Sequence, residues 1–214
     1  MRIVIDLQAC QSTGSRTRGI GRYSLSLAKA MARNAGGHDL QLALSGLFAD
    51  TILPLRQEFA GLVESENIHI WQAPAAVADL DAGNRWRRCA GELIREQALA
   101  ELRPDIVHVS SLFEGLTDDA LTSVGNAGEP LPTAVTLYDL IPLINSRHYL
   151  ENAQVRSWYY RKVQALKNAD LLLAISESSR QEGLDWLHVP EHRIVNISSA
   201  VDERFQQLQY PPSQ

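Results

Sequence analysis

Short apolar runs alternate along the chain with longer segments in which apolar residues recur at helical spacing. The runs are rich in valine, isoleucine and leucine, and most of them are apolar throughout rather than alternating with polar residues. Such runs are typical of strands in a parallel sheet, because helices cover both faces of that sheet. The predicted strands span residues 2–7, 40–44, 68–71, 106–109, 134–137, 171–175 and 194–197.

The segments between the runs predict helices. In one segment the recurring apolar residues are Ile20, Tyr23, Leu27 and Met31. In another, a shared face consists of Trp86, Cys89, Leu93 and Gln97. Further helices are predicted over residues 50–62 and 151–168, and Ser176 stands at the N-cap position of another. The alternation of strand and helix predicts an α/β fold: a doubly wound, mostly parallel Rossmann-like sheet with helices on both faces.

Composition narrows the class of protein without changing this picture. A chain of 214 residues with ordinary apolar and charged content is most simply one large domain. We place that domain at residues 1–207 and the start of a linker at 208–214. The net charge of −5 argues against non-specific electrostatic binding of nucleic acid. Two cysteines cannot form a disulfide framework, which fits a reducing cytoplasm, and no apolar run approaches the ~18–20 residues that span a bilayer.

No motif points to metal or hydrolase chemistry. The histidines are scattered, and no acidic cluster has the spacing of a metal cage. The zinc-hydrolase motif and the nucleophile motif of α/β-hydrolases are also missing from the sequence. We therefore expect neither a metal nor an organic cofactor.

A polar, glycine-bearing loop at residues 11–19 follows the first predicted strand, at the edge where open α/β sheets bind ligands. Gly14 and Gly19 have the spacing of a phosphate-cradling loop, but the lysine and serine or threonine required next are missing. Gly19 and Gly21 also begin a dinucleotide-like pattern, in which Ser24 replaces the third glycine; this weakens a nicotinamide oxidoreductase as an alternative. What remains is a glycine-bearing helix entry whose amides can accept a phosphate or a hydroxylated ligand, or a plain structural helix entry.

The predicted strand at 134–137 delivers polar groups to the same edge. Tyr138 and Asp139 follow it directly, and Pro142 argues against a simple helical continuation. The phenol and the carboxylate are candidates for orienting a ligand hydroxyl. In the alternative interpretation, Asp139 only caps a turn.

The predicted strand at 106–109 ends in a third group of polar residues. Ser110, Ser111 and Glu114 follow the strand and are candidates for ligand binding. His108 lies inside the apolar run, where a core histidine is favoured over a catalytic base. A long acidic connection at 115–132 then leads to the next strand, and loops of this length are usually functional or mobile.

Five segments occur in an order that resembles one family. They are Met1-Arg2-Ile3-Val4-Ile5-Asp6, Arg18-Gly19-Ile20-Gly21-Arg22-Tyr23, Tyr138-Asp139-Leu140-Ile141-Pro142, Ala174-Ile175-Ser176-Glu177-Ser178-Ser179-Arg180, and Leu187-His188-Val189-Pro190-Glu191-His192-Arg193-Ile194 with the following Ala200-Val201-Asp202. Together they resemble the amino-terminal, acceptor-side half of a retaining family 4 (group 1) glycosyltransferase of the GT-B fold. The resemblance is to mannosyltransferase-like members that assemble bacterial polysaccharide and lipopolysaccharide, and it covers nearly the whole chain.

The resemblance implies a site for the nucleotide sugar. The glycine loop of the family lies over the donor diphosphate and the acceptor, which implies that Gly19, Gly21 and Arg22 bind there. Ser110 and Glu114, placed by the end of their strand, complete the predicted substrate- and donor-diphosphate-binding set.

The resemblance also implies a catalytic pair. A histidine and an aspartate of the family commonly face the transferred sugar; Tyr138 stands in place of that histidine, and Asp139 is kept. We therefore expect Tyr138 and Asp139 to orient the sugar or the acceptor hydroxyl.

The substrates expected from the resemblance are a GDP- or UDP-sugar donor and a glycan or lipid-linked acceptor. Family members carry a second, donor-binding carboxy-terminal domain. We expect that domain to be absent from this chain, and the chain alone to transfer little sugar. Cations mixed with aromatic residues at 85–88 and 156–162 suggest a peripheral contact at the inner face of the cytoplasmic membrane, or ordinary amphipathic helices. The alternative function is a non-catalytic glycan- or protein-binding module of Rossmann-like fold.

Overall fold

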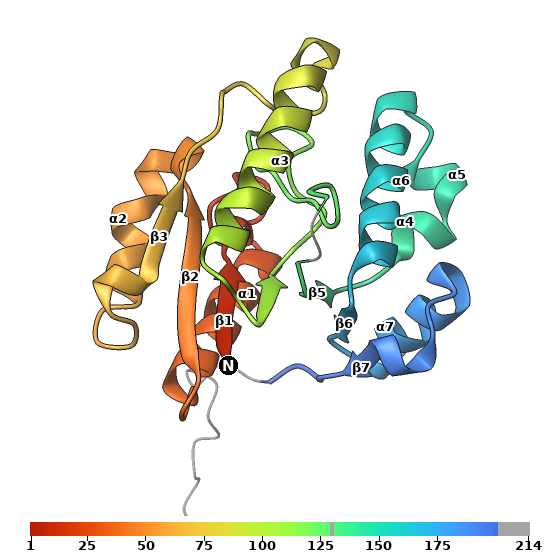
Figure 1. Cartoon of the computed structure of the whole chain (residues 1–214). Coiled ribbons are helices and arrows are strands. Elements are labelled where there is room, and N and C mark those ends of the chain that lie inside the picture. The colour runs from red at the N-terminus through yellow and green to blue at the C-terminus, as the bar shows by residue number, and fades with distance from the viewer. Residues whose placement is uncertain (129–130, 201–214) are drawn as a thin grey trace, which may run out of the picture.

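In a computed structural model of the chain, the described residues form a parallel sheet of seven strands in the order β3-β2-β1-β4-β5-β6-β7 (Figure 1). The structure describes residues 1–128 and 131–200. The strands are β1 (Arg2–Asp6), β2 (Asp39–Ser45), β3 (Ile68–Trp71), β4 (Ile106–Val109), β5 (Thr133–Leu137), β6 (Leu171–Ala174) and β7 (Ile194–Asn196). Every predicted strand is confirmed, because a run that is apolar throughout marks a strand covered on both faces.

The predicted helices are also present. The helices are α1 (Gly19–Arg33), α2 (Ala49–Glu58), α3 (Arg85–Glu101), α4 (Ile141–Ile144), α5 (Ser146–Tyr149), α6 (Ala153–Asn168) and α7 (Glu177–Glu182). The prediction of an N-cap at Ser176 is confirmed, since its Oγ accepts a hydrogen bond from the backbone N–H of Ser179 at 3.1 Å. The predicted linker at 208–214 lies outside the described residues.

The expectation that Pro142 prevents helical continuation is wrong. Pro142 lies in the first turn of the short helix α4. The first N–H groups of a helix have no intrahelical partner, so a proline costs no hydrogen bond there, and its fixed φ suits the helix.

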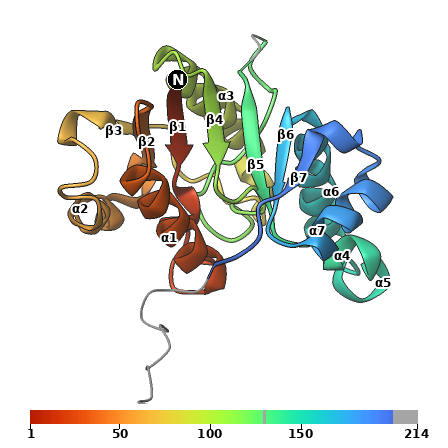
Figure 2. The same ribbon diagram turned by 90° about the horizontal axis from the view of Figure 1, so that it is seen from below.

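The sheet lies between two layers of helices (Figure 2), and an apolar core fills the space on each side of it. One core joins strand residues to α1 and α2, and its members include Ile5, Leu42, Ile68, Ala28 and Leu55. The other core joins strand residues to α3 and α6, and its members include Val4, Val107, Val135, Leu99 and Leu166. The order of the strands reverses between β1 and β4, which pair in parallel. The carboxyl edge at such a reversal is where open α/β sheets bind ligands.

The face of α3 picked out by its helical spacing is turned to solvent. The residues that share the predicted face are all exposed: Trp86, Cys89, Leu93 and Gln97. The side chains buried instead include Arg88, Glu92, Arg95 and Glu96. This helix packs against the polar connection between β4 and β5, so it turns its charged side chains inward, where they meet hydrogen-bonding partners.

Candidate functional site

The loops after β1 and β4 meet at the carboxyl edge of the sheet. The Oγ of Ser12 donates to Asp118 Oδ2 at 2.8 Å, and the Oγ of Ser15 donates to Glu114 Oε1 at 2.6 Å. Each bond joins residues about a hundred positions apart in the sequence. The topology therefore brings together the glycine loop and the third polar group, as their predicted strand ends imply.

The two glycines of the predicted diphosphate site have different surroundings. A Cβ on Gly19 would meet no atom within 4 Å, so this position is open. A Cβ on Gly21 would lie 2.4 Å from the carbonyl oxygen of Ser15, whose oxygen also accepts a hydrogen bond from the Gly21 N–H at 3.1 Å. Gly21 is thus required by the chain's own loop, while Gly19 and the side chain of Arg22 are exposed at the beginning of α1.

Tyr138 connects three elements at this edge. Its hydroxyl donates to the carbonyl oxygen of Ser110 at 3.1 Å and lies 3.0 Å from the Oγ of Ser24. Its ring packs edge-to-face on Tyr23, with 5.6 Å between the ring centroids. Burial raises the pKa of Tyr138, so the phenol stays protonated at neutral pH. The structure therefore brings Tyr138, Ser110 and Ser24 into contact.

Ser24 is a site residue that sequence reasoning did not select. Its side chain is buried in α1, one turn after the exposed entry of the helix. The available signal was its place in the glycine pattern, where it stands for the third glycine. A small residue there allows β5 to bring the Tyr138 phenol against the helix.

Asp139 is exposed at the same edge. Its Oδ1 accepts a hydrogen bond from the backbone N–H of Ile141 at 3.1 Å, which is the turn-capping contact of the alternative interpretation. Glu182 accepts a hydrogen bond from the N–H of Leu140 at 2.8 Å and so fixes the same turn from α7. The carboxylate of Asp139 is accordingly held in place but accessible.

Ser110 and Glu114 are buried, and each is bonded within the chain. The Oγ of Ser110 donates to the carbonyl oxygen of Asp6 at 2.7 Å. Glu114 Oε1 accepts from Ser15 and from the Oγ of Ser111, the latter at 2.8 Å. Burial raises the pKa of Glu114, and the hydrogen bonds from the serines oppose that effect. Both residues support the edge in this structure, and their contact with a substrate stays a prediction.

His108 is a core histidine in the structure. Its Nε2 lies 2.8 Å from the Oγ1 of Thr136, and its side chain is buried. Burial lowers its pKa to about 4, so the ring is neutral near pH 7. These contacts agree with the interpretation that favours a structural role over that of a catalytic base.

Two features are absent from residues 1–128 and 131–200. No helix there is long and apolar enough to cross a membrane. Among the same residues, no group of three or more histidine, cysteine, aspartate or glutamate side chains could hold a metal ion.

The parallel sheet, with polar loops at the point where the strand order reverses, defines a Rossmann-like α/β domain. Residues 17–205 match the model of Glycosyltransferase Family 4, and the chain belongs to this family. The resemblance stated from the sequence motifs is thereby confirmed.

Two relatives and two solved structures give further detail. The chain is 36% identical over 211 residues to the serotype-specific mannosyltransferase WbdA of Escherichia coli, a match that covers 98% of this chain and 25% of that protein. A second Escherichia coli WbdA is 34% identical over 185 residues, covering 86% and 23%. The chain thus spans about a quarter of the length of these relatives.

The solved structures support the fold alone, because their identities are low. Arabidopsis thaliana UGT89C1 complexed with quercetin superposes with a TM-score of 0.53 at 11% identity, over 99% of this chain and 52% of that chain. A putative UDP-N-acetylglucosamine 2-epimerase from Listeria monocytogenes gives a TM-score of 0.50 at 13% identity, over 90% and 43%.

Proposed function

We propose that this chain is the acceptor-side domain of a retaining glycosyltransferase that transfers a hexose, in the first place mannose, from a nucleotide sugar to a growing polysaccharide or lipid-linked glycan. The observation that carries the proposal is the 36% identity to a mannosyltransferase over nearly the entire chain. The donor in this proposal is a GDP- or UDP-sugar, which acts as a substrate, and no metal or organic cofactor is assigned to the domain.

The carboxyl edge of the sheet provides the groups that this function requires. The open entry at Gly19 and the exposed guanidinium of Arg22 are suited to the donor diphosphate, because amides and the positive end of α1 attract anions. The accessible carboxylate of Asp139 is suited to orienting a hydroxyl of the sugar or the acceptor. Tyr138 holds β5 against α1 beside it and can contribute a further hydrogen bond to the sugar.

The proposed reaction needs little acid–base help from this domain. In retaining transfer, the departing diphosphate oxygen can take the proton of the acceptor hydroxyl while donor-side groups stabilise the negative charge. Those groups belong to a carboxy-terminal donor-binding domain in the proposal. The 214-residue chain alone is therefore expected to show no transfer from nucleotide sugars above background.

The experiment is sugar transfer by a chimera in which this chain replaces the matching segment of Escherichia coli WbdA. Asp139→Asn keeps the oxygen that accepts from Ile141 but removes the charge, so folding should be unchanged. We expect transfer to fall about tenfold or more, the factor given by one lost transition-state interaction of ~1.4 kcal/mol. The matched control is Asp185→Asn, a substitution of an exposed aspartate whose one side-chain partner among the described residues is Gln181. Equal transfer by both variants would contradict the assignment of Asp139.

The second candidate function is a non-catalytic glycan- or protein-binding module. It is favoured by the internal hydrogen bonds that already engage Tyr138, Ser110 and Glu114. A chimera that binds the acceptor glycan but transfers no sugar would support this alternative.

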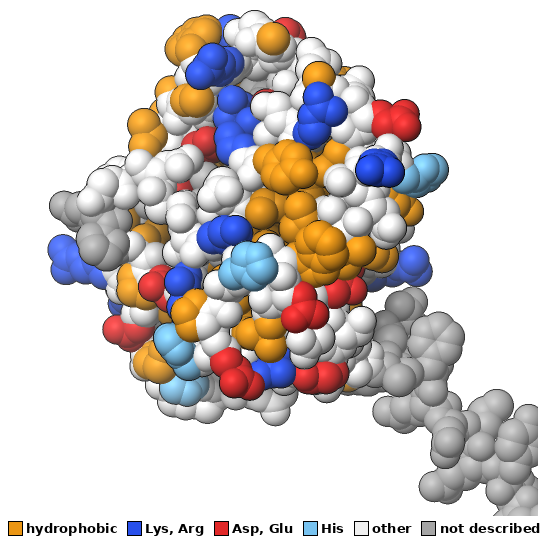
Figure 3. Space-filling model, turned by 90° about the vertical axis from the view of Figure 1, so that its right-hand side faces the viewer, with side chains coloured by type: hydrophobic (Ala, Val, Ile, Leu, Met, Phe, Trp, Pro, Cys, Tyr) orange, Lys and Arg blue, Asp and Glu red, His pale blue; other side chains and the backbone are white. Residues whose placement is uncertain are grey.

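The proposal also includes a cellular location. We propose that the protein is cytoplasmic and makes a peripheral contact at the inner face of the cytoplasmic membrane. Hydrophobic side chains gather on the side of the molecule where α4, α5 and α6 lie (Figure 3), and the exposed ones include Ile141, Tyr149 and Tyr160. Trp158 and Tyr159 of the same region are buried, as in an ordinary amphipathic helix. Co-flotation with anionic vesicles at low salt, lost at high salt, would support the contact; absence of co-flotation at low salt would contradict it.

A further inference from the structure

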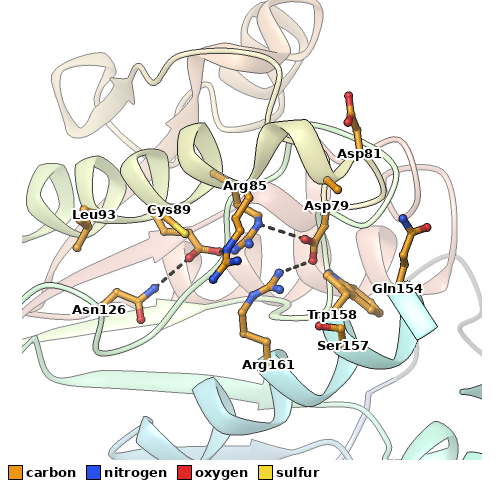
Figure 4. Close-up of a pocket in the computed structure, with 13 residues that line it drawn as sticks. Asp79, Asp81, Arg85, Cys89, Leu93, Asn126, Gln154, Ser157, Trp158 and Arg161 are labelled. Atoms are coloured by element: carbon orange, nitrogen blue, oxygen red, sulfur yellow. Dashed lines mark hydrogen bonds and ion pairs between the residues drawn. The ribbon is translucent and has the colours of Figure 1, made fainter. Parts of the chain in front are cut away.

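A pocket of about 720 Å³ opens between the first halves of α3 and α6 (Figure 4). Its lining comes from both helices, from the segment that holds Asp79, and from Asn126 in the connection between β4 and β5. None of the site residues predicted from the sequence lines it. The volume lies within the ~300–1,000 Å³ that is usual for pockets of small-molecule ligands.

Charged groups inside the pocket hold one another in a fixed frame (Figure 4). Asp79 accepts a hydrogen bond from Arg161 of α6, and its Oδ1 lies 3.1 Å from the Nε of Arg88 of α3. Glu92 Oε1 lies 3.5 Å from Arg88 Nη1, and Glu92 Oε2 accepts from the amide of Asn126 at 3.1 Å. The frame orients several donors and acceptors before any ligand arrives, which lowers the cost of binding one.

Other polar groups at the pocket are left outside this frame. Arg85 is exposed and makes no hydrogen bond or ion pair with the described residues. The side chains of Gln154 and Ser157 also lie exposed at the pocket, without hydrogen-bond partners among those residues. Trp158 supplies an apolar wall of the pocket. A hydrogen bond from its Nε1 to the carbonyl oxygen of Glu114, at 3.3 Å, holds the indole in place.

The balance of charge selects the class of ligand. Guanidinium groups come from Arg85, Arg88 and Arg161, and carboxylates from Asp79, Asp81 and Glu92, so the formal charges of the lining cancel. A phosphate would be attracted only weakly, because the lining carries no net positive charge. A purely apolar ligand would desolvate many polar groups without offering them hydrogen bonds. A neutral polyhydroxyl compound can donate to the carboxylates, accept from the guanidinium and amide groups, and place its C–H groups on the indole.

We infer that this pocket is a saccharide-binding site, lined by none of the candidate site residues, that holds a neutral sugar unit of the glycan acceptor. The pocket and the carboxyl edge are joined through Glu114, whose carboxylate accepts from Ser15 at the edge and whose carbonyl accepts from Trp158 at the pocket. That the sugar is mannose rests on the proposed function, whereas the preference for a neutral saccharide rests on the lining of the pocket.

The experiment uses Cys89, which lines the pocket and is exposed, as a reporter. The other cysteine, Cys10, is buried, and burial raises the pKa of its thiol to about 12, so it should not react. The rate of maleimide labelling of Cys89 is measured on the 214-residue chain with α-linked mannotriose added. At about 10 mM sugar, tenfold above a Kd of ~1 mM, we expect labelling to slow about tenfold and the effect to saturate.

Three variants test whether the protection arises in the pocket. Arg85→Gln removes the unpartnered guanidinium, and Ser157→Trp fills the opening; both positions are exposed, so the fold should be retained. We expect each to weaken protection by about fivefold or more, as the loss of a charged hydrogen bond or of the space predicts. Arg147→Gln, at an exposed position on α5 outside the pocket, is the matched control and should protect as the unchanged chain does.

Three results would overturn the inference: no protection by mannotriose, equal protection in all three variants, or protection by inorganic phosphate in place of the sugar. This test is independent of catalysis. Protection without transfer by the chimera leaves the saccharide site standing and removes the proposed function. Sugar transfer by the chimera without protection of Cys89 by mannotriose supports the proposed function and removes the saccharide site.

Discussion

The helices α1 and α3 lie against opposite faces of one sheet (Figure 2). The side chains that they bury differ in kind, small on α1 and largely charged on α3. Helix α1 buries the small residues Gly21, Ser24 and Ala28. Helix α3 buries Arg95 and Glu96, while its apolar residues Trp86, Leu93 and Ile94 are exposed. The comparison shows that a periodic pattern of apolar residues locates a helix but does not by itself say which face is inside.

The neighbours of the two helices explain the difference. Helix α1 packs on an apolar core that β1 and β2 supply. Helix α3 meets residues 110–128, which connect β4 to β5 and whose backbone groups need partners. Arg95 Nη1 donates to the carbonyl oxygen of Ser123 at 3.1 Å, and Glu96 Oε2 accepts from the N–H of Asn126 at 2.8 Å. The buried charged side chains of α3 thus supply hydrogen-bond partners for backbone groups of this connection, which has no regular secondary structure to supply them.

The largest expected effect comes from Arg95, whose Nε donates to Asp6 Oδ2 at 2.7 Å in the interior. Arg95→Met leaves the carboxylate of Asp6 buried without its cation, so we expect the free energy of unfolding to fall by about 3–5 kcal/mol. The matched control on α1 is Lys29→Met, which breaks a partly exposed pair with Glu58 and should cost under ~1 kcal/mol. Urea unfolding followed by circular dichroism measures both. Equal losses would show that the buried pair does not distinguish the two faces.

The second effect depends on pH and concerns the face of the sheet toward α1, where His108 lies beside Ile5. The folded pKa of His108 is lowered to about 4 from 6.5, so the unfolded chain binds the proton first as pH falls. Stability from this residue is complete above pH 6.5 and is lost toward pH 4, by up to about 3 kcal/mol. Urea unfolding across this range should show the loss in the unchanged chain and a flatter profile in His108→Asn. Parallel profiles would contradict the assignment.

The third effect separates two glycines on α1. Gly21→Ala places a Cβ against the carbonyl oxygen of Ser15, and we expect a loss of about 1–3 kcal/mol in the free energy of unfolding. Gly19→Ala meets no atom within 4 Å and should be nearly neutral, which makes it the matched control. Thermal unfolding of both variants measures the difference. A neutral Gly21→Ala would mean that the loop before α1 is not packed as described.

The smallest effect is expected on the outward face of α3. Leu93 is 47% exposed, so Leu93→Gln should change the free energy of unfolding by less than ~0.5 kcal/mol. Leu99, on the inward face of the same helix and 1% exposed, is the control, and Leu99→Ala should cost about 2–5 kcal/mol. Urea unfolding of the two variants gives the comparison. A large loss for Leu93→Gln would indicate that a further partner covers this face.

The amino-acid sequence by itself determined the strands, the parallel α/β class and the edge at which the candidate site lies. A strand buried on both faces must be apolar at every position, so such runs are visible without knowledge of their neighbours. The polar groups at Gly19, Ser110 and Tyr138 could be assigned to one edge for a related reason, since the carboxyl ends of parallel strands lie together. The N-cap at Ser176 was also predictable, because its partner is only three residues away.

The tertiary structure alone decided which face of α3 is buried, which partners engage Tyr138, and where the saccharide pocket lies. These features depend on contacts between distant residues, such as Arg95 with Asp6 and Arg161 with Asp79. From the sequence alone a charged residue is expected at the surface, because burying its charge costs free energy unless a partner of opposite charge is present. The partner becomes known only when the sheet and its connections have been assembled in space.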